Sequence, residues 1–232
     1  MKILGIDSSA KSASAAVTEN GKIISSFYIN TGLTHSQTLM PMVDNVLKCA
    51  NLSLDDIGLI AVNKGPGSFT GIRIGVAGAK GLADVKKIPV LGVSTLESMA
   101  YNLLGKDCIA CAVMDARCNQ VYSALFDISG DKITRLTEDE AISVDELLQN
   151  ITKYDKMKIF VGDGAEMCYN KSVNVSEGTM LAAENIRYQN AAGVCFAAET
   201  YDPTSYISAL ALVPEYLRLP QAERELKAKN LK

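Results

Sequence analysis

The chain has 232 residues, 48% of them hydrophobic and 21% charged, a balance that excludes a disordered chain and indicates a soluble globular protein. No apolar run approaches the roughly 20 residues that cross a bilayer, and the start MKILGID is typical of a strand, so we expect a cytoplasmic protein without a membrane partner. The net charge of −3 excludes a protein that wraps nucleic acid unaided, because phosphate binding requires clustered Lys and Arg. Only the tail at 224–232 is basic, and we interpret it as a solvated helix end.

The first half of the chain alternates strands and helices. Strands are predicted at 3–7, 14–17 and 22–29, a helix at 36–50 capped by Thr34 or Ser36, a strand at 57–62, a glycine loop at 65–71, a helix to residue 84, a strand at 89–93 and a helix to residue 104. A turn at 105–107 then separates the predicted N-terminal lobe, 1–106, from a C-terminal lobe, 107–232. We expect the final helix to pack back on the N-terminal lobe.

The second half opens as the first does. Asp7 and Asp115 each end an apolar strand, and each is followed by a polar turn, a second strand, a glycine turn and a third strand. Two diverged copies of a β-β-β-α-β-α unit predict an α/β protein of two similar lobes with a cleft between them. The two aspartates would face this cleft.

This duplicated plan resembles the actin, Hsp70 and sugar-kinase (ASKHA) superfamily, in which the hairpin turn of each lobe holds a phosphate through backbone N–H groups. Glycine permits that close approach because it lacks a Cβ. The turns here, at 8–11 and 116–119, contain no glycine. We therefore expect Asp7 and Asp115 to be vestigial cleft residues in a protein that needs no cofactor, with weak ATP binding left open.

A glycine loop at 63–75 carries the most specific pattern. Its residues form a tight turn after a strand, and Ser68 or Thr70 can cap the helix that follows. It is not a Walker loop, because the G-x-x-x-x-G-K-[ST] spacing is absent. A structural turn and a ligand loop both remain open for its members, which are Gly65, Pro66, Gly67, Ser68, Thr70 and Gly71.

Metal binding is not expected. The six cysteines are scattered, and Cys108 and Cys111 lie in one predicted strand, whose alternation sends their sulfurs to opposite faces. His35 is the single histidine, whereas a hydrolytic zinc site needs three ligands and an open position. We interpret His35 as a hydrogen-bonding residue at a helix start.

The run Gly-Pro-Gly-Ser-Phe-Thr-Gly-Ile-Arg-Ile-Gly at 65–75 resembles the signature of the bacterial TsaB (YeaZ) family. Weaker matches follow in the expected order at 6–9, 35–36, 79–83, 94–96, 114–117 and 214–218, so the resemblance spans most of the chain. It implies a non-catalytic subunit that pairs with its paralogue TsaD, and through the complex with the ATPase TsaE. Together they attach threonylcarbamoyl to the adenosine beside the anticodon in tRNAs reading codons that begin with A, and tRNA would be bound only within the complex. The alternatives are a glycoprotease-like metallopeptidase and an ASKHA-type kinase.

A partner surface is predicted on the helices at 36–50 and 71–84. The first has an apolar arc wider than one sheet face requires, and the second contains interior glycines that each cost about 1 kcal/mol relative to alanine. Stepping about 100° per residue gives the second helix a core stripe of Ile72, Val76, Ala79 and Ala83, and a solvated stripe of Arg73, Lys80 and Asp84. The predicted partner-binding residues are Leu39, Met42, Val46, Ile74, Gly75, Gly78, Gly81 and Leu82. The same surface would form a homodimer, and burial of both faces within the lobe stays open as the alternative.

Overall fold

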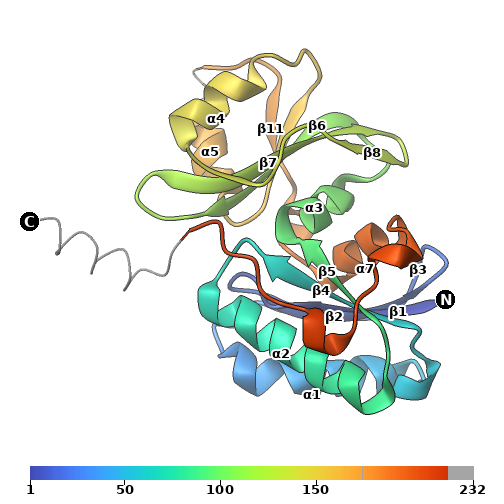
Figure 1. The fold of residues 1–232 in the computed structure, drawn as a ribbon. Coiled ribbons are helices and arrows are strands. Elements are labelled where there is room, and N and C mark those ends of the chain that lie inside the picture. Colours follow the sequence, from blue (N-terminus) through green and yellow to red (C-terminus); the bar gives the residue numbers. More distant parts are fainter. Residues whose placement is uncertain (174, 219–232) are drawn as a thin grey trace, which may run out of the picture.

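Two β-sheets, one from each half of the chain, organise the fold (Figure 1). The structure is a computed structural model and describes residues 1–173 and 175–218. The basic tail predicted at 224–232, and any helix in it, lie outside the described residues.

The first sheet has the order β3-β2-β1-β4-β5. The first three strands are antiparallel neighbours, and β4 and β5 continue the sheet in parallel. Its central strands β1, β2 and β4 are apolar or small over most of their length because both faces are covered, and their charged residues lie near the strand ends. The strands are β1 (Lys2–Asp7), β2 (Ala13–Glu19), β3 (Lys22–Ile29), β4 (Leu59–Gly65) and β5 (Val90–Ser94).

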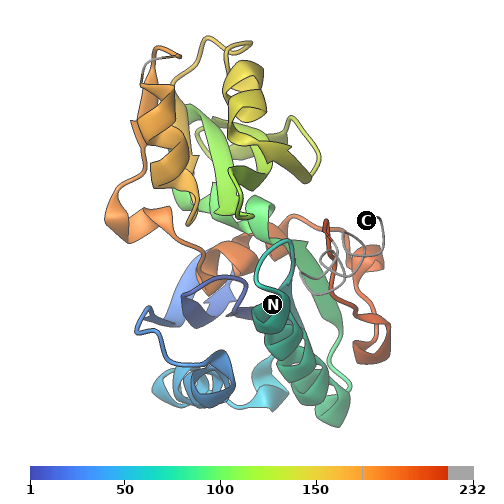
Figure 2. The ribbon, with the colours of Figure 1, turned by 90° about the vertical axis from the view of Figure 1, so that its left-hand side faces the viewer.

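Helices α1 (His35–Cys49) and α2 (Phe69–Lys86) cover one face of this sheet, and Figure 2 shows them next to each other beneath it. The predicted core stripe of α2 is confirmed, since all four of its members are buried against the sheet. The opposite face is covered by α7 (Ala191–Glu199), which comes from the far end of the chain. A short 3₁₀ turn, Leu54–Asp56, precedes β4.

The second sheet has the order β11-β10-β6-β7-β8, with β9 paired to β7. Helices α4 (Val144–Ile151) and α5 (Ala165–Ser172) cover one face, and α3 (Thr95–Ala100) with the 3₁₀ turn Tyr101–Leu103 covers the other. The strands are β6 (Asp107–Asp115), β7 (Gln120–Ser129), β8 (Lys132–Arg135), β9 (Glu140–Ser143), β10 (Lys158–Val161) and β11 (Thr179–Leu181).

The same plan therefore occurs twice: a three-stranded antiparallel unit, then two parallel strands joined by helices. This confirms the predicted two-lobed α/β fold and its duplication. Cys108 and Cys111 lie on opposite faces of β6, as predicted, because one belongs to each of the two cores that flank the second sheet.

Helices α3 and α7 lie between the two sheets and pack on each other (Figure 1). The chain enters the second lobe after α3 and returns through α6 (Glu184–Arg187) to α7. Two 3₁₀ turns, Pro203–Ser205 and Ala209–Ala211, then lead along the first lobe. Among the described residues, none of the helices combines the length and apolar character that a membrane crossing requires.

Candidate functional site

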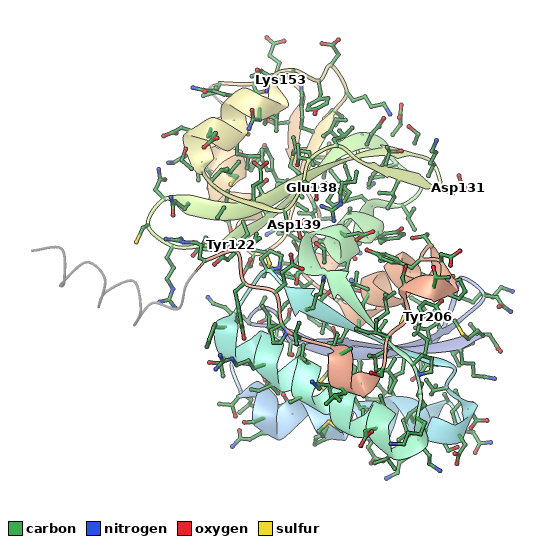
Figure 3. The ribbon with its side chains drawn as sticks, viewed as in Figure 1. Tyr122, Asp131, Glu138, Asp139, Lys153 and Tyr206 are labelled. Atoms are coloured by element: carbon green, nitrogen blue, oxygen red, sulfur yellow. The ribbon has the colours of Figure 1, made fainter. Side chains whose placement is uncertain are left out.

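A cleft of about 440 Å³ lies between the lobes. The glycine loop lines it together with the β1–β2 turn, the β6–β7 turn and the C-terminal segment of the described chain. The sequence features singled out as a loop and two vestigial turns thus meet at one place. Tyr122 of β7, labelled in Figure 3 at the junction of the lobes, also lines the cleft.

Asp7 ends β1 and is fully buried. Its Oδ1 accepts hydrogen bonds from the Ser9 backbone N–H (3.1 Å), the Ser9 hydroxyl (2.6 Å) and the Asn63 amide (2.8 Å). Burial raises the pKa of Asp7, and the bonds from Ser9 and Asn63 oppose that rise. Asp7 therefore orders its own turn through Ser9 and Asn63, and it does not itself line the cleft.

Asp115 occupies the equivalent place at the end of β6 and is exposed. The Arg117 N–H donates to its Oδ1 at 2.7 Å, the same i+2 contact that Ser9 makes with Asp7. Beside it lies Asp163, just after β10, whose pKa is raised by burial. Asp163 was not predicted as a site residue, although a polar residue two positions after a buried strand was the available signal.

The glycine loop is packed against the β1–β2 turn. A Cβ on Gly67 would collide with the Ser9 carbonyl and one on Gly71 with the Ser8 carbonyl. The Ser68 N–H donates to the Ser9 carbonyl at 2.7 Å, and the Ser8 hydroxyl donates to the Gly71 carbonyl at 2.8 Å. These glycines are thus required by close approach of the chain's own backbone. The loop packs on the β1–β2 turn, and its residues 66–70 line the cleft.

Helix α2 begins as predicted. The Ser68 hydroxyl accepts from the Gly71 N–H and caps the helix, whereas Thr34 caps α1 without a side-chain bond. His35 lies at the start of α1, and its Nε2 is 2.7 Å from the Ala10 carbonyl, which confirms its hydrogen-bonding role. Within 1–173 and 175–218 no group of three His, Cys, Asp or Glu side chains is arranged to hold a metal ion.

Residues 212–218, called the strap from here on, run from α2 across the cleft. The Glu215 N–H donates to the Lys64 carbonyl at 2.7 Å, and Tyr216 stacks on Phe69 with ring centroids 4.6 Å apart. Arg73 lies over the Phe69 ring and donates to the Tyr216 hydroxyl at 2.8 Å. The motif at 214–218 was matched in the sequence without a structural role, and the structure supplies one.

The predicted partner surface is corrected in part. Leu39, Met42 and Val46 are buried in the core between α1 and the first sheet, so they line no surface of the isolated chain. Gly75 faces the same way: a Cβ there would lie 2.5 Å from the Ser8 hydroxyl oxygen. Helical periodicity gave the angular spacing of these residues but not the side on which the sheet lies. Lys80 of the predicted solvated stripe is half-exposed, and its ammonium donates to the Leu210 and Leu212 carbonyls.

The other predicted partner-binding residues do reach the surface. Ile74 and Leu82 are half-buried, and a Cβ on Gly81 would meet nothing within 4 Å. A Cβ on Gly78 would have one neighbour within 4 Å, the sulfur of Met40 at 3.3 Å. Met40 and Val85, which the sequence analysis did not assign to this surface, are 41% and 74% exposed. The α1–α2 face is defined here as Met40, Ile74, Gly78, Gly81, Leu82 and Val85.

The family model for TsaD, tRNA N6-adenosine threonylcarbamoyltransferase, matches residues 30–225. The tRNA threonylcarbamoyladenosine biosynthesis protein TsaB of Bacillus subtilis is 31% identical over 228 residues, which cover 96% of each chain. The chain belongs to the TsaB family. YeaZ from Pseudomonas aeruginosa, a solved structure, superposes with a TM-score of 0.79 at 26% identity and covers 93% of this chain and 99% of that one.

The glycine loop, whose sequence resembles the signature of this family, packs on the β1–β2 turn. The chain is also similar to a second kind of relative. The tRNA N6-adenosine threonylcarbamoyltransferase of Brachyspira hyodysenteriae is 29% identical over 185 residues, which cover 71% of this chain and 52% of that protein. TsaB family members and these transferases are thus related in sequence over most of the present chain.

Proposed function

We propose that this TsaB family member is a non-catalytic subunit that pairs with a TsaD-type transferase. In this proposal the pair, engaged by TsaE, transfers threonylcarbamoyl to the adenosine beside the anticodon in the cytoplasm, and tRNA is bound only by the assembled complex. The observation that carries the proposal is the α1–α2 face, where Met40 and Val85 are exposed and a Cβ on Gly81 would meet nothing within 4 Å.

The glycines make the α1–α2 face suited to close packing against the backbone of another helix. Interior glycine costs a helix about 1 kcal/mol relative to alanine. At Gly75 the lack of a side chain is required within the chain, because Ser8 lies against it. At Gly81 no neighbouring atom lies within 4 Å of a Cβ, so nothing in the chain requires glycine there. Close approach of a partner helix at Gly78 and Gly81 would offset the cost, with Ile74, Leu82 and Val85 as the apolar contacts beside the seam.

A paralogous partner fits this arrangement. Related lobes present similar helix pairs, so two such faces can meet about a two-fold axis as a four-helix contact. The same geometry supports homodimer formation when the paralogue is absent.

Chemistry by the chain itself has less support. The Ser9 N–H and hydroxyl are directed to Asp7, and the Ser9 carbonyl is used by the glycine loop. The Ser9 N–H of the β1–β2 turn is therefore not free to hold a phosphate, as the N–H groups of a nucleotide-binding turn do. We propose accordingly that the chain requires no cofactor.

Co-expression with a tagged TsaD from the same organism, followed by affinity purification and size-exclusion chromatography, tests the pairing. Wild type is expected to co-elute with TsaD, and Gly78→Leu to be lost from the complex while remaining folded. Gln149→Leu on α4 adds the same side chain to an exposed helical position of the other lobe and should pair like wild type. Wild type that elutes apart from TsaD, or Gly78→Leu that co-elutes normally, would contradict the proposal.

A further inference from the structure

Polar contacts join the two lobes on two sides of α3. One set, called the Arg135 clasp, consists of Ser94, Glu97, Arg135, Asp139 and Tyr201. The other is the strap, which ends at Arg218. Arg135 lines a groove beside α3 with Tyr101 and Thr200, whereas Arg218 lines the interlobe cleft. Figure 1 shows β8 and the end of the strap at opposite ends of the junction.

The Arg135 clasp is a continuous chain of contacts. Ser94, at the end of β5 in the first sheet, donates its hydroxyl to Asp139 at 2.5 Å. Arg135, in β8 of the second sheet, donates to Asp139 at 2.7 Å and lies 3.5 Å from the Glu97 carboxylate on α3. Figure 3 places Asp139 at the junction of the lobes.

The chain of contacts continues to the segment after α7, where the Tyr201 hydroxyl donates to Glu97 at 2.7 Å. The Glu97 and Asp139 side chains are only 16% and 17% exposed, and Arg135 also lies over the Phe126 ring at 4.7 Å. Charged hydrogen bonds that are shielded in this way are stronger than those on an open surface.

The strap makes the second connection. It is fixed to the first lobe by the Glu215 bond to Lys64 and by the stack of Tyr216 on Phe69. It then reaches the second lobe, where Arg218 donates to the Ala116 carbonyl in the β6–β7 turn at 2.7 Å. The strap thus spans the cleft from one lobe to the other.

We propose that these two clasps hold the lobes at one fixed opening, so that the chain does not close and open its cleft and presents its surfaces as one rigid block. Rotation of the lobes that widens the cleft must break the Arg218 contact. Rotation in the opposite sense must separate Asp139 from Ser94. Because the contacts lie on opposite sides of α3, either rotation meets one of them.

Distance measurements between spin labels on the two lobes test this proposal. Cys49, at the end of α1, is an exposed natural cysteine, and Lys153→Cys supplies a second exposed label in the other lobe. Cys118→Ser removes the remaining exposed thiol. Lys156→Ala is the control, since Lys156 bonds to Asp107 and Asp127 entirely within the second lobe.

Wild type and the control are expected to give one narrow distance distribution. The double variant Asp139→Ala, Arg218→Ala removes both of the contacts that oppose rotation and should give a distribution at least about two-fold broader, or a second distance, as domains freed to rotate do. Circular dichroism verifies that the double variant is folded, and Asp139→Leu with Arg218→Gln replaces it if it is not. A wild-type distribution that is already broad, or a folded double variant indistinguishable from wild type, would overturn the proposal.

Discussion

Two glycines of α2 should respond with opposite signs to the same substitution. Gly81→Ala adds a methyl group where nothing lies within 4 Å, so the helix gains its propensity term of about 1 kcal/mol. The melting temperature should rise by roughly 2–4 °C for a chain of this size. Gly75→Ala places the methyl carbon 2.5 Å from the buried Ser8 hydroxyl oxygen, which itself donates to the Gly71 carbonyl.

At Gly75 the propensity gain is outweighed. Overpacking of a core costs about 1–3 kcal/mol and loss of a buried hydrogen bond about 1 kcal/mol, so the net destabilisation should be about 1–3 kcal/mol. Urea unfolding followed by far-ultraviolet circular dichroism measures both variants against wild type, with equal m-values required for the comparison. The division of α2 into a core face and an open face is wrong if the two variants shift stability in the same direction.

Three further outcomes are expected. Burial raises the folded-state pKa of Asp7 above its unfolded value, so folding disfavours the charged carboxylate. The free energy of unfolding of Asp7→Asn should therefore increase relative to that of wild type as pH rises above about 4. A stability difference between the two proteins that does not change with pH would refute this. Native protein should expose two thiols to Ellman's reagent, at Cys49 and Cys118, since the other four cysteines are buried; rapid reaction of all six would contradict the burial pattern. Calorimetric titration with Mg-ATP should show no tight site, and a tight one-to-one isotherm would contradict the interpretation of the β1–β2 turn. Elemental analysis should show no stoichiometric metal, and about one zinc per chain would contradict the interpretation of His35.

Much of the first lobe could be predicted from the sequence, because its signals are local. The strand at 22–29 is bounded by a glycine turn, and the start of α2 is fixed by the Ser68 cap. The duplication is visible because Asp7 and Asp115 end strands of the same kind. Such features depend on neighbouring residues alone.

The parts that could not be predicted depend on contacts distant in sequence. Helix α7 is buried on nearly every side, against the first sheet and α3, so it lacks the amphipathic period that identifies a surface helix. The partner surface was misassigned at Leu39 and Gly75 because periodicity does not say which side a sheet covers. The strap and Asp163 reach the cleft only through the tertiary fold.

The most direct test of the account is reconstitution of threonylcarbamoyl transfer with purified TsaD, TsaE, the enzyme that makes threonylcarbamoyl-adenylate, and tRNA. Transfer should require this chain, should be lost with Gly78→Leu, and should persist with Asp115→Asn and Asp163→Asn, which alter the cleft carboxylates without touching the α1–α2 face. Transfer by this chain without TsaD, or its loss in a cleft variant that still pairs with TsaD, would contradict a non-catalytic role.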